Sequence, residues 1–335
     1  MTEPPQKNPP EAGTTRVPVQ DLLGAALDEL RLEILAGGSH LDNEIIHPRV
    51  QKPGLAFAGY YDYIKTGRVQ IIGASETAYL ETLDRITRHD RFDRITALDV
   101  PVFVITKGIE PLPGFLDLCI EREVPVLGSS AMSSTVIKEI SWFLEERLAP
   151  TSALHGVLME IFGLGVLLIG NSGVGKSESA LDLITRGHSL VADDQVTVKR
   201  FPSGEVVGSS VGPLHHHMEL RGVGIINVQD LFGLAAVRER KTVDLVVELE
   251  AWVEGKAYDR HGLDESLYDI LGIPIPYLLM PVALGRNISV LVEIAARNHV
   301  LKLQGHDSAR EFARTLNYEI EQNRRQLEAA RKPPR

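Results

Sequence analysis

The stretch Val166-Leu-Leu-Ile-Gly170-Asn-Ser-Gly-Val-Gly175-Lys176-Ser177 decides the fold of the second half of this chain. Its apolar start predicts a strand, and its glycines predict a tight turn, because glycine adopts backbone angles that a Cβ atom forbids. In the spacing Gly-x-x-x-x-Gly-Lys-Ser, consecutive backbone N–H groups curl around phosphate oxygens. The stretch therefore predicts a phosphate-binding loop made of Gly170, Asn171, Ser172, Gly173, Val174, Gly175, Lys176 and Ser177.

The residues after the loop support this prediction. Residues 177–186 carry strong helix formers with apolar residues at helical spacing, and Gly187 ends the pattern, so a helix N-terminus would face the anion. Lys176 supplies a cation for the β- and γ-phosphates, and the Ser177 hydroxyl suits a magnesium ion. The competing interpretation is an ordinary tight turn, but both flanks match the strand and helix that nucleotide binding requires.

The composition is that of an ordinary globular protein. Its 335 residues are 44% hydrophobic and 24% charged, which allows two domains. The 35 Lys and Arg minus the 45 Asp and Glu give a net charge of −10, which argues against general nucleic-acid binding. No apolar run reaches the ~20 residues that span a bilayer, so no membrane partner is expected. A single cysteine, Cys119, excludes an internal disulfide and fits a reducing cytoplasm.

The first half of the chain predicts a small α/β domain over residues 16–150, of uncertain role. Its Pro-rich, polar start at 1–15 predicts disorder. Strands are predicted at 69–73, 102–106 and 125–128, and helices at 17–35, 76–89, 113–123 and 135–148. Pro150-Thr-Ser152 marks the boundary, so the catalytic domain is expected at 151–330.

A histidine precedes the phosphate loop. Residues 154–162 predict a strand that turns through Gly163 and Gly165 into the strand before the loop. Such a hairpin would bring His155 alongside that strand. A lone histidine is more often a packed or surface residue than a catalytic one, so the pattern alone leaves both roles open.

Two acids follow the helix after the loop. Residues 188–192 predict a short strand that ends on Asp193 and Asp194, so both carboxylates are expected to project toward the phosphates. This compressed layout favours a kinase whose local carboxylate takes the proton of a substrate hydroxyl. A solvated Asp-Asp turn is the alternative. Residues 195–199 and 205–208 then predict a β-hairpin.

A further acid lies in a glycine-rich segment. Three consecutive histidines at 215–217 cannot all face one metal from a strand, because neighbouring side chains alternate sides. Glu219 lies beside Arg221, and the residues alone leave open whether it forms an ion pair or binds magnesium.

In combination these motifs closely resemble those of the HPr kinase/phosphorylase family. The matching stretches are His155-Gly-Val-Leu, the phosphate loop through Glu178, Arg186-Gly-His, Val191-Ala-Asp-Asp194 and Met218-Glu-Leu-Arg-Gly-Val-Gly-Ile-Ile-Asn-Val228. The likeness extends to Arg49-Val-Gln-Lys-Pro-Gly-Leu55 and to Pro281-Val … Gly285-Arg-Asn287, so it covers nearly the whole chain.

The resemblance implies a bifunctional cytoplasmic enzyme that phosphorylates a serine of the phosphocarrier protein HPr and removes that phosphate by phosphorolysis. It implies ATP or pyrophosphate as the phosphoryl donor, with Mg²⁺. It also implies a homohexamer of two-domain subunits, each with an α/β domain in front of a P-loop kinase domain similar to phosphoenolpyruvate carboxykinase.

The family's site residues fall on matching positions of this chain. By resemblance, Lys176 binds phosphate, and Ser177 and Glu219 are the magnesium ligands. Asp194 resembles the base that accepts the serine proton, and its protonated form would be the acid of the reverse reaction. His155 matches the family's active-site histidine.

One more match and one departure lie near the C-terminal end. Arg260 matches the family's active-site arginine. The family usually has Pro-Val-Arg-Pro-Gly-Arg in a loop tied to dephosphorylation, whereas this chain has Pro281-Val-Ala283-Leu284-Gly285-Arg286. Loss of a cation there predicts an intact kinase with impaired phosphorolysis.

Two other classes of function remain open from the sequence. A kinase of another substrate on the same scaffold would keep Lys176, Ser177 and Asp194 but ignore HPr. A nucleotide-binding regulator would bind ATP and transfer nothing. Near the C-terminal end, a helix is predicted at 308–330, and its apolar stripe of Phe312, Leu316 and Ile320 is expected to pack against another subunit or the protein substrate.

Overall fold

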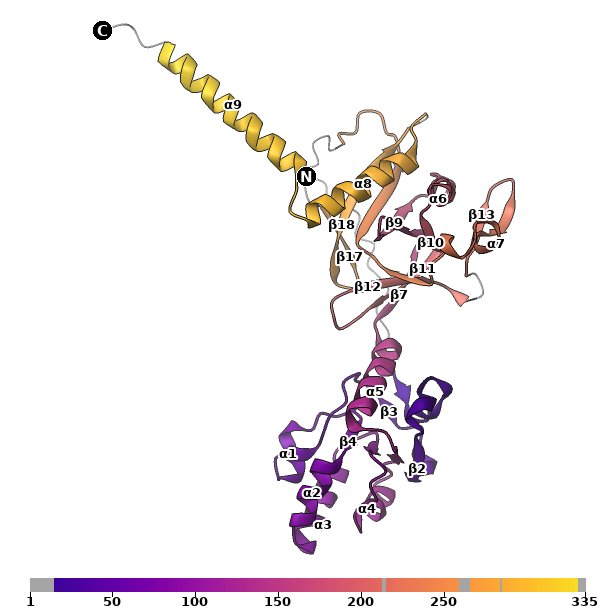
Figure 1. Ribbon diagram of the computed structural model, residues 1–335, viewed down its shortest axis with the longest axis vertical. Helices are drawn as coiled ribbons and strands as arrows, with labels where there is room; N and C mark the ends of the chain where they lie inside the picture. The colour runs from indigo at the N-terminus through magenta and orange to yellow at the C-terminus, as the bar shows by residue number, and fades with distance from the viewer. Residues whose placement is uncertain (1–14, 213–214, 259–265, 284, 331–335) are drawn as a thin grey trace. The chain divides into compact units, whose positions relative to one another are not determined.

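The computed structural model describes residues 15–212, 215–258, 266–283 and 285–330 (Figure 1). The disorder expected at 1–15 therefore falls almost entirely outside the described residues. The described chain forms two units that divide after Pro150. None of the helices in these ranges has the length and apolarity of a membrane span.

The first unit, up to Pro150, alternates short strands and helices. Its elements are β1 (Val17–Pro18), η1 (Val19–Leu23), η2 (Ala25–Leu30), β2 (Glu33–Ala36), η3 (Gly38–His40), β3 (Glu44–Ile45), α1 (Gly54–Phe57), η4 (Tyr61–Tyr63), β4 (Gln70–Ile72), α2 (Ala74–Thr82), α3 (Arg85–Thr96), β5 (Phe103–Ile105), α4 (Phe115–Glu121), β6 (Val126–Gly128) and α5 (Ser133–Leu148).

The core of this unit is a four-stranded sheet in the order β2-β6-β5-β4. The three strands expected from the sequence are confirmed as β4, β5 and β6, which run parallel, while β2 runs antiparallel to β6. Val104 packs with α5 on one face of the sheet, and Phe103 and Ile105 pack with α3 and α4 on the other. This alternation of buried side chains explains why the strands are apolar throughout.

The helix expected at 17–35 is wrong. Pro18 and Gly24 are extended there, with ψ of 146° and 167°, so they interrupt any continuous helix. The apolar residues of this stretch are buried by the two short 3-10 helices η1 and η2, and the chain then continues as β2.

The single helix expected at 76–89 is also wrong, because it is two helices. The backbone is extended at Leu83, and Asp84 begins a new helix by accepting hydrogen bonds from the backbone N–H groups of Ile86 and Thr87. An aspartate N-cap satisfies donors that the first helical turn leaves unpaired.

The second unit, from Thr151 onward, contains most of the strands. Its elements are β7 (Thr151–His155), β8 (Val157–Ile161), β9 (Leu164–Gly170), α6 (Lys176–Thr185), β10 (Ser189–Ala192), β11 (Gln195–Arg200), β12 (Val206–Ser210), β13 (His217–Leu220), β14 (Gly224–Asn227), α7 (Val228–Phe232), η6 (Leu234–Ala236), β15 (Arg240–Thr242), β16 (Leu245–Ala251), β17 (Ser266–Ile270), β18 (Ile273–Val282), α8 (Ile288–Leu303) and α9 (Ser308–Ala330).

A mixed sheet of six strands, in the order β10-β8-β9-β16-β18-β17, organises this unit. Its strands β9, β16 and β18 run parallel, so their carboxyl ends meet at one edge. A second sheet, β15-β12-β11-β7, is antiparallel and includes the hairpin expected at 195–208. Strands β13 and β14 form a separate hairpin.

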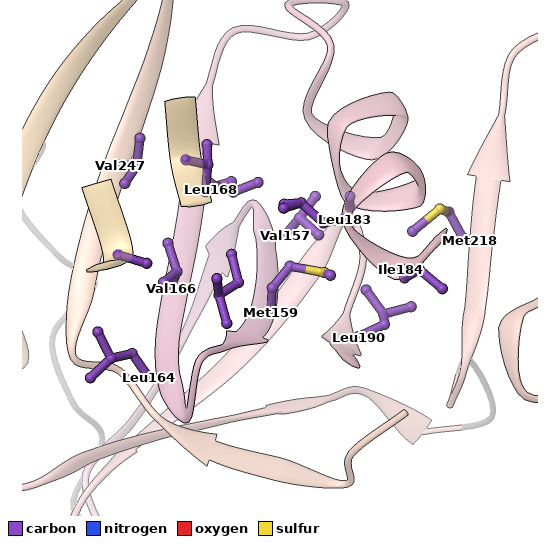
Figure 2. Packing of buried hydrophobic residues seen from close by; sticks show 14 of the residues in the cluster. Val157, Met159, Leu164, Val166, Leu168, Leu183, Ile184, Leu190, Met218 and Val247 are labelled. Carbon is purple, nitrogen blue, oxygen red and sulfur yellow. The ribbon is translucent and has the colours of Figure 1, made fainter. Parts of the chain in front are cut away.

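The two faces of the six-stranded sheet are covered differently. Val166 and Leu168 of β9 pack with Leu183 of α6 in one apolar cluster (Figure 2). The same cluster includes Val292 of α8. Leu167, which points to the opposite face, packs in another cluster with residues of the antiparallel sheet. Successive side chains of β9 are thus buried on alternate faces of the sheet. This packing on both faces holds the strand that leads into the loop.

Candidate active site

The loop predicted to bind phosphate joins β9 to α6. The backbone angle φ is +139° at Gly170, +80° at Gly173 and +101° at Gly175, a region that favours glycine. A Cβ atom at Gly170 would also lie 2.3 Å from the backbone oxygen of Leu249 on β16. The loop therefore needs these glycines both for its turns and for its close approach to the neighbouring strand.

Lys176 is the first residue of α6, and its side chain lies against the loop. Its Nζ donates to the backbone oxygens of Gly170 at 2.8 Å and Asn171 at 3.2 Å. Only 7% of this residue is exposed. The ammonium is thus held at the loop by two neutral acceptors, which a polyphosphate would outcompete as a charged partner.

Ser177, Asp193 and Glu219 come together beside the loop. The Ser177 hydroxyl donates to Oδ1 of Asp193 at 2.9 Å, and the backbone N–H of Glu219 donates to its Oδ2 at 3.3 Å. Asp193 thereby joins the start of α6 to β13. The Ser177 hydroxyl and the Asp193 carboxylate are hard oxygen ligands of the kind that suits Mg²⁺ with its remaining waters, and Glu219 reaches the group through its backbone.

Burial raises the pKa of the Asp193 carboxyl above its ordinary value, although the hydrogen bond from Ser177 opposes the shift. Desolvation disfavours the charged form, and Asp193 has no cation among these partners. A divalent cation near this carboxylate would remove the penalty.

This pKa direction predicts how metal-free stability depends on pH. Because folded Asp193 holds its proton more tightly than the unfolded chain does, its protonated form favours folding, and that contribution is lost as pH rises from the unfolded pKa through the folded one. We expect Asp193→Asn to gain stability relative to the unmutated protein over that rise in pH. Urea unfolding of both proteins across this range, without Mg²⁺, measures the difference.

Asp182→Asn is the matched control, because the hydrogen bond from Ser289 and then that from Arg186 lower the pKa of Asp182. Asp182 stabilises the fold above its unfolded pKa, and this contribution is lost as pH falls through the folded pKa. Its variant should therefore lose relative stability as pH rises from the folded pKa of Asp182 to the unfolded one, and the difference should stay constant across the higher range in which Asp193 titrates. A pH-independent difference for Asp193→Asn would contradict the assigned burial effect.

Asp194 lies next to Asp193 but is exposed to solvent. Its backbone adopts a left-handed conformation, with φ of +66°, and its carbonyl accepts a hydrogen bond from Gly156. Oδ1 of Asp194 lies 3.1 Å from Nδ1 of His155, and the two side chains are 75% and 58% exposed. Asp194 thus offers an accessible carboxylate beside the imidazole of His155. Its neighbour in the chain, Asp193, is the acid that contacts Ser177.

The route by which His155 reaches this position differs from the expectation. Strand β8, not β7, forms the hairpin with β9, and His155 ends β7 opposite Gln195 of β11 in the other sheet. Gly156 separates the two strands, and a Cβ atom there would lie 2.6 Å from the backbone oxygen of Leu168. The expected placement of His155 alongside the loop strand is therefore wrong, and its contact is with Asp194.

Arg221 contacts the phosphate loop. It approaches the Ser172 hydroxyl at 3.5 Å, and its Nη1 would lie 3.0 Å from a Cβ atom at Gly173. Among the residues that the structure describes, Arg221 and Glu219 form no ion pair with each other. The guanidinium therefore reaches the side of the loop where phosphate oxygens would be held.

The remaining candidates are less defined. Arg260 and Leu284 lie outside the described residues. His215 and His217 contact Ser210 and a backbone oxygen respectively, while His216 has φ of +64°. Within the described ranges no three His, Cys, Asp or Glu side chains are grouped to hold a metal ion.

Two residues at the site had no role assigned from sequence. Asp193 was paired with Asp194 as a candidate, but its contacts with Ser177 and Glu219 depend on how α6, β10 and β13 meet. The position of an acid at the end of a buried strand was the available signal. The sequence offers Arg221 only as a partner for Glu219 and gives no sign of its approach to Ser172, a residue of the predicted phosphate-binding loop.

Two family models match the chain. The model described as HPr Serine kinase N terminus matches residues 17–144, and the model described as HPr Serine kinase C-terminal domain matches residues 146–316. Together they span both units.

Named relatives match along most of their own length. A protein of Geobacter sulfurreducens named HPr kinase/phosphorylase is 45% identical over 299 residues, which cover 89% of this chain and 93% of that one. One of Peptoclostridium acidaminophilum with the same name is 40% identical over 87% of this chain and 94% of its own. A solved structure, the Hpr(Ser) kinase/phosphatase from Coxiella burnetii, is 37% identical, covers 48% of this chain and 98% of that one, and has a TM-score of 0.43.

Proposed function

Because this chain belongs to the HPr kinase/phosphorylase family, we propose that it phosphorylates a serine of HPr and also removes that phosphate by phosphorolysis. The observation that best supports this is the adjacency of Asp193 and Asp194. One contacts the loop serine Ser177, and the other is open to a protein substrate beside His155.

Phosphate binding is assigned to the loop of residues 170–177 and to Lys176. Its turns carry three glycines at positive φ, and α6 begins at its end, so backbone N–H groups and the helix N-terminus favour an anion there. Lys176 adds the charge. ATP or pyrophosphate as the donor fits this site, because the loop recognises phosphates and not the rest of the donor.

Magnesium is assigned to Ser177 and Glu219, and Asp193 is placed to take part through its contacts with both. When bound, the ion neutralises the charge of the donor's phosphates. Asp193 orients the Ser177 hydroxyl and so fixes the direction of its oxygen.

Asp194 is the proposed proton acceptor. In the kinase direction it takes the proton of the HPr serine as the serine oxygen bonds to the transferred phosphorus, and the donor's bridging oxygen leaves. In reverse, inorganic phosphate attacks the phosphoserine phosphorus, pyrophosphate forms, and the departing serine oxygen takes the proton from Asp194. His155, whose Nδ1 lies 3.1 Å from Oδ1 of Asp194, holds the carboxylate in place. Arg260 is proposed, by its match to the family, to stabilise the transferred phosphoryl group.

The family also supports several broader proposals. These are that the second unit has a scaffold similar to phosphoenolpyruvate carboxykinase, that the subunits assemble as a homohexamer, and that the enzyme works in the cytoplasm without nucleic-acid or membrane partners. Cys119 is buried, and burial raises the pKa of its thiol to about 12, so it is a neutral core residue.

The test of the function is transfer of label from ATP to purified HPr. We expect label on HPr and none on an HPr that lacks the target serine. Label on another protein or small molecule, but not on HPr, would favour a kinase of a different substrate. Tight ATP binding without any transfer would favour a regulator.

The loop after β18 predicts a weak reverse reaction. Ala283 stands where the family usually has arginine, and β18 is parallel to β16 and β9 at the edge where the phosphate loop begins. We expect Ala283→Arg to raise pyrophosphate release from phospho-HPr about 10-fold, the effect of one charged hydrogen bond to the second anion. Forward phosphorylation should change little.

Ala235→Arg, at an exposed position of the same unit, adds the same charge elsewhere and serves as the control. Pyrophosphate release that is the same before and after Ala283→Arg would refute the assigned role of this position.

A further inference from the structure

An exposed aromatic pair lies just after β16. The rings of Trp252 and Tyr258 are stacked, with centroids 5.0 Å apart and planes at 30°. Despite this contact, 47% of Trp252 remains exposed. Indole is among the largest apolar surfaces that a side chain offers, and none of the site assignments made so far uses it.

The pair is held in a preformed turn. The backbone N–H of Trp252 donates to the backbone oxygen of Val282 at 2.8 Å, and the backbone N–H of Val253 donates to the Tyr258 hydroxyl at 3.1 Å. That hydroxyl donates in turn to Glu250 at 3.0 Å, and Glu250 pairs with Lys256 at 2.7 Å. The rings are therefore positioned by backbone and charged contacts and do not depend on a ligand for their order.

The turn lies at the same sheet edge as the phosphate loop. In the parallel pair β9–β16, Leu249 is the partner of Gly170, so Trp252 follows that position by three residues, or roughly 10 Å of extended chain. Ligands of such sheets bind outside the carboxyl ends of the parallel strands. An aromatic side chain at this distance from the loop is within reach of the part of a nucleotide that lies beyond its phosphates.

A cation completes the arrangement. The Arg286 guanidinium lies over the Trp252 ring at 5.9 Å from its centroid. This distance is longer than that of a close cation–π stack. A planar guanidinium can also stack on nucleic-acid bases. Arg286 follows β18, so the two residues approach each other from neighbouring strands.

We propose that Trp252 stacks on the purine base of the nucleotide donor, with Arg286 contacting the base or its ribose. This assignment rests on the proposed function, since it concerns the donor of that reaction. It divides the site into a phosphate half, which any polyphosphate fills, and a base half, which only a nucleotide fills. Pyrophosphate would use the first half alone.

The test compares donors with and without a base. Isothermal titration measures Kd for ATP and for inorganic triphosphate, each with Mg²⁺, using the full chain and Trp252→Ala. We expect ATP to bind about 5- to 100-fold more weakly to the variant, which is the usual effect of losing one base–aromatic stack. Triphosphate should bind within about twofold of its original affinity, because it has no base to lose. Trp252→Phe should restore most of the ATP affinity.

Trp142→Ala is the matched control, because this other tryptophan is 53% exposed on α5 of the first unit. It should leave both affinities unchanged. Equal weakening of ATP and triphosphate by Trp252→Ala would overturn the proposal and indicate a distorted loop, and an unchanged ATP affinity would overturn it outright. Binding is measured without HPr, so a failure of the kinase assignment would appear separately, as absent label transfer.

Discussion

Asp194→Asn is expected to lower the rate of HPr phosphorylation by about 10²–10⁴-fold, the contribution of a positioned general base. The amide keeps the size of the side chain but does not accept the serine proton. The side chain is exposed, and among the residues that the structure describes its close partner is His155, so the substitution should leave folding intact. Single-turnover transfer of label from ATP to HPr measures the chemical step.

Two measurements distinguish the loss of the proton acceptor from a general loss of binding or folding. ATP affinity should be nearly unchanged, because in the described part of the chain Asp194 contacts His155 and Gly156, which lie outside the loop. The release of pyrophosphate from phospho-HPr should fall along with the forward rate. Glu205→Gln, another exposed carboxylate of this unit, is the control and should keep both activities. Label transfer at the original rate by Asp194→Asn would contradict the assigned base.

Lys176→Ala is expected to reduce both directions of the reaction by about 10²–10³-fold, as does removal of one charged donor to the transition state. The ammonium now donates to Gly170 and Asn171, and these neutral acceptors would yield to phosphate. ATP and inorganic triphosphate should both bind more weakly, because the loss concerns the phosphate half of the site. Titration of both ligands and steady-state rates measure these effects.

The side chain of Lys176 is buried, so the variant needs a check of folding by urea denaturation. Lys138→Ala, which removes an ammonium that is 81% exposed in the first unit, is the control. If Lys176→Ala kept ATP affinity and both rates while folded, the phosphate-binding role of the lysine would be rejected.

Local patterns predicted much of the site. The spacing from Gly170 to Ser177 indicated a strand, loop and helix, and β9 and α6 are found there. These signals worked because the loop's conformation depends on its own glycines and on the apolar residues of its two flanks. The strand that ends before Asp193 was predictable for the same reason.

Contacts between distant segments were not predictable. The Asp193 carboxylate meets Ser177 and Glu219, which lie 16 and 26 residues away in the chain. His155 was expected beside the loop strand, but Gly156 divides the hairpin and turns β7 into the other sheet. In the first unit, Pro18 and Gly24 are extended and interrupt the helix that the spacing of the apolar residues predicts.

The left-handed backbone at Asp194, with φ of +66°, carries a consequence for the engineering of this enzyme. Aspartate tolerates that conformation better than most residues do, but glycine adopts it without the steric cost of a Cβ atom. A library selected for heat resistance alone would thus favour glycine at 194 and discard the proposed proton acceptor. Thermal stability and catalytic activity would therefore favour different residues at position 194, so a screen for heat resistance must also select for activity.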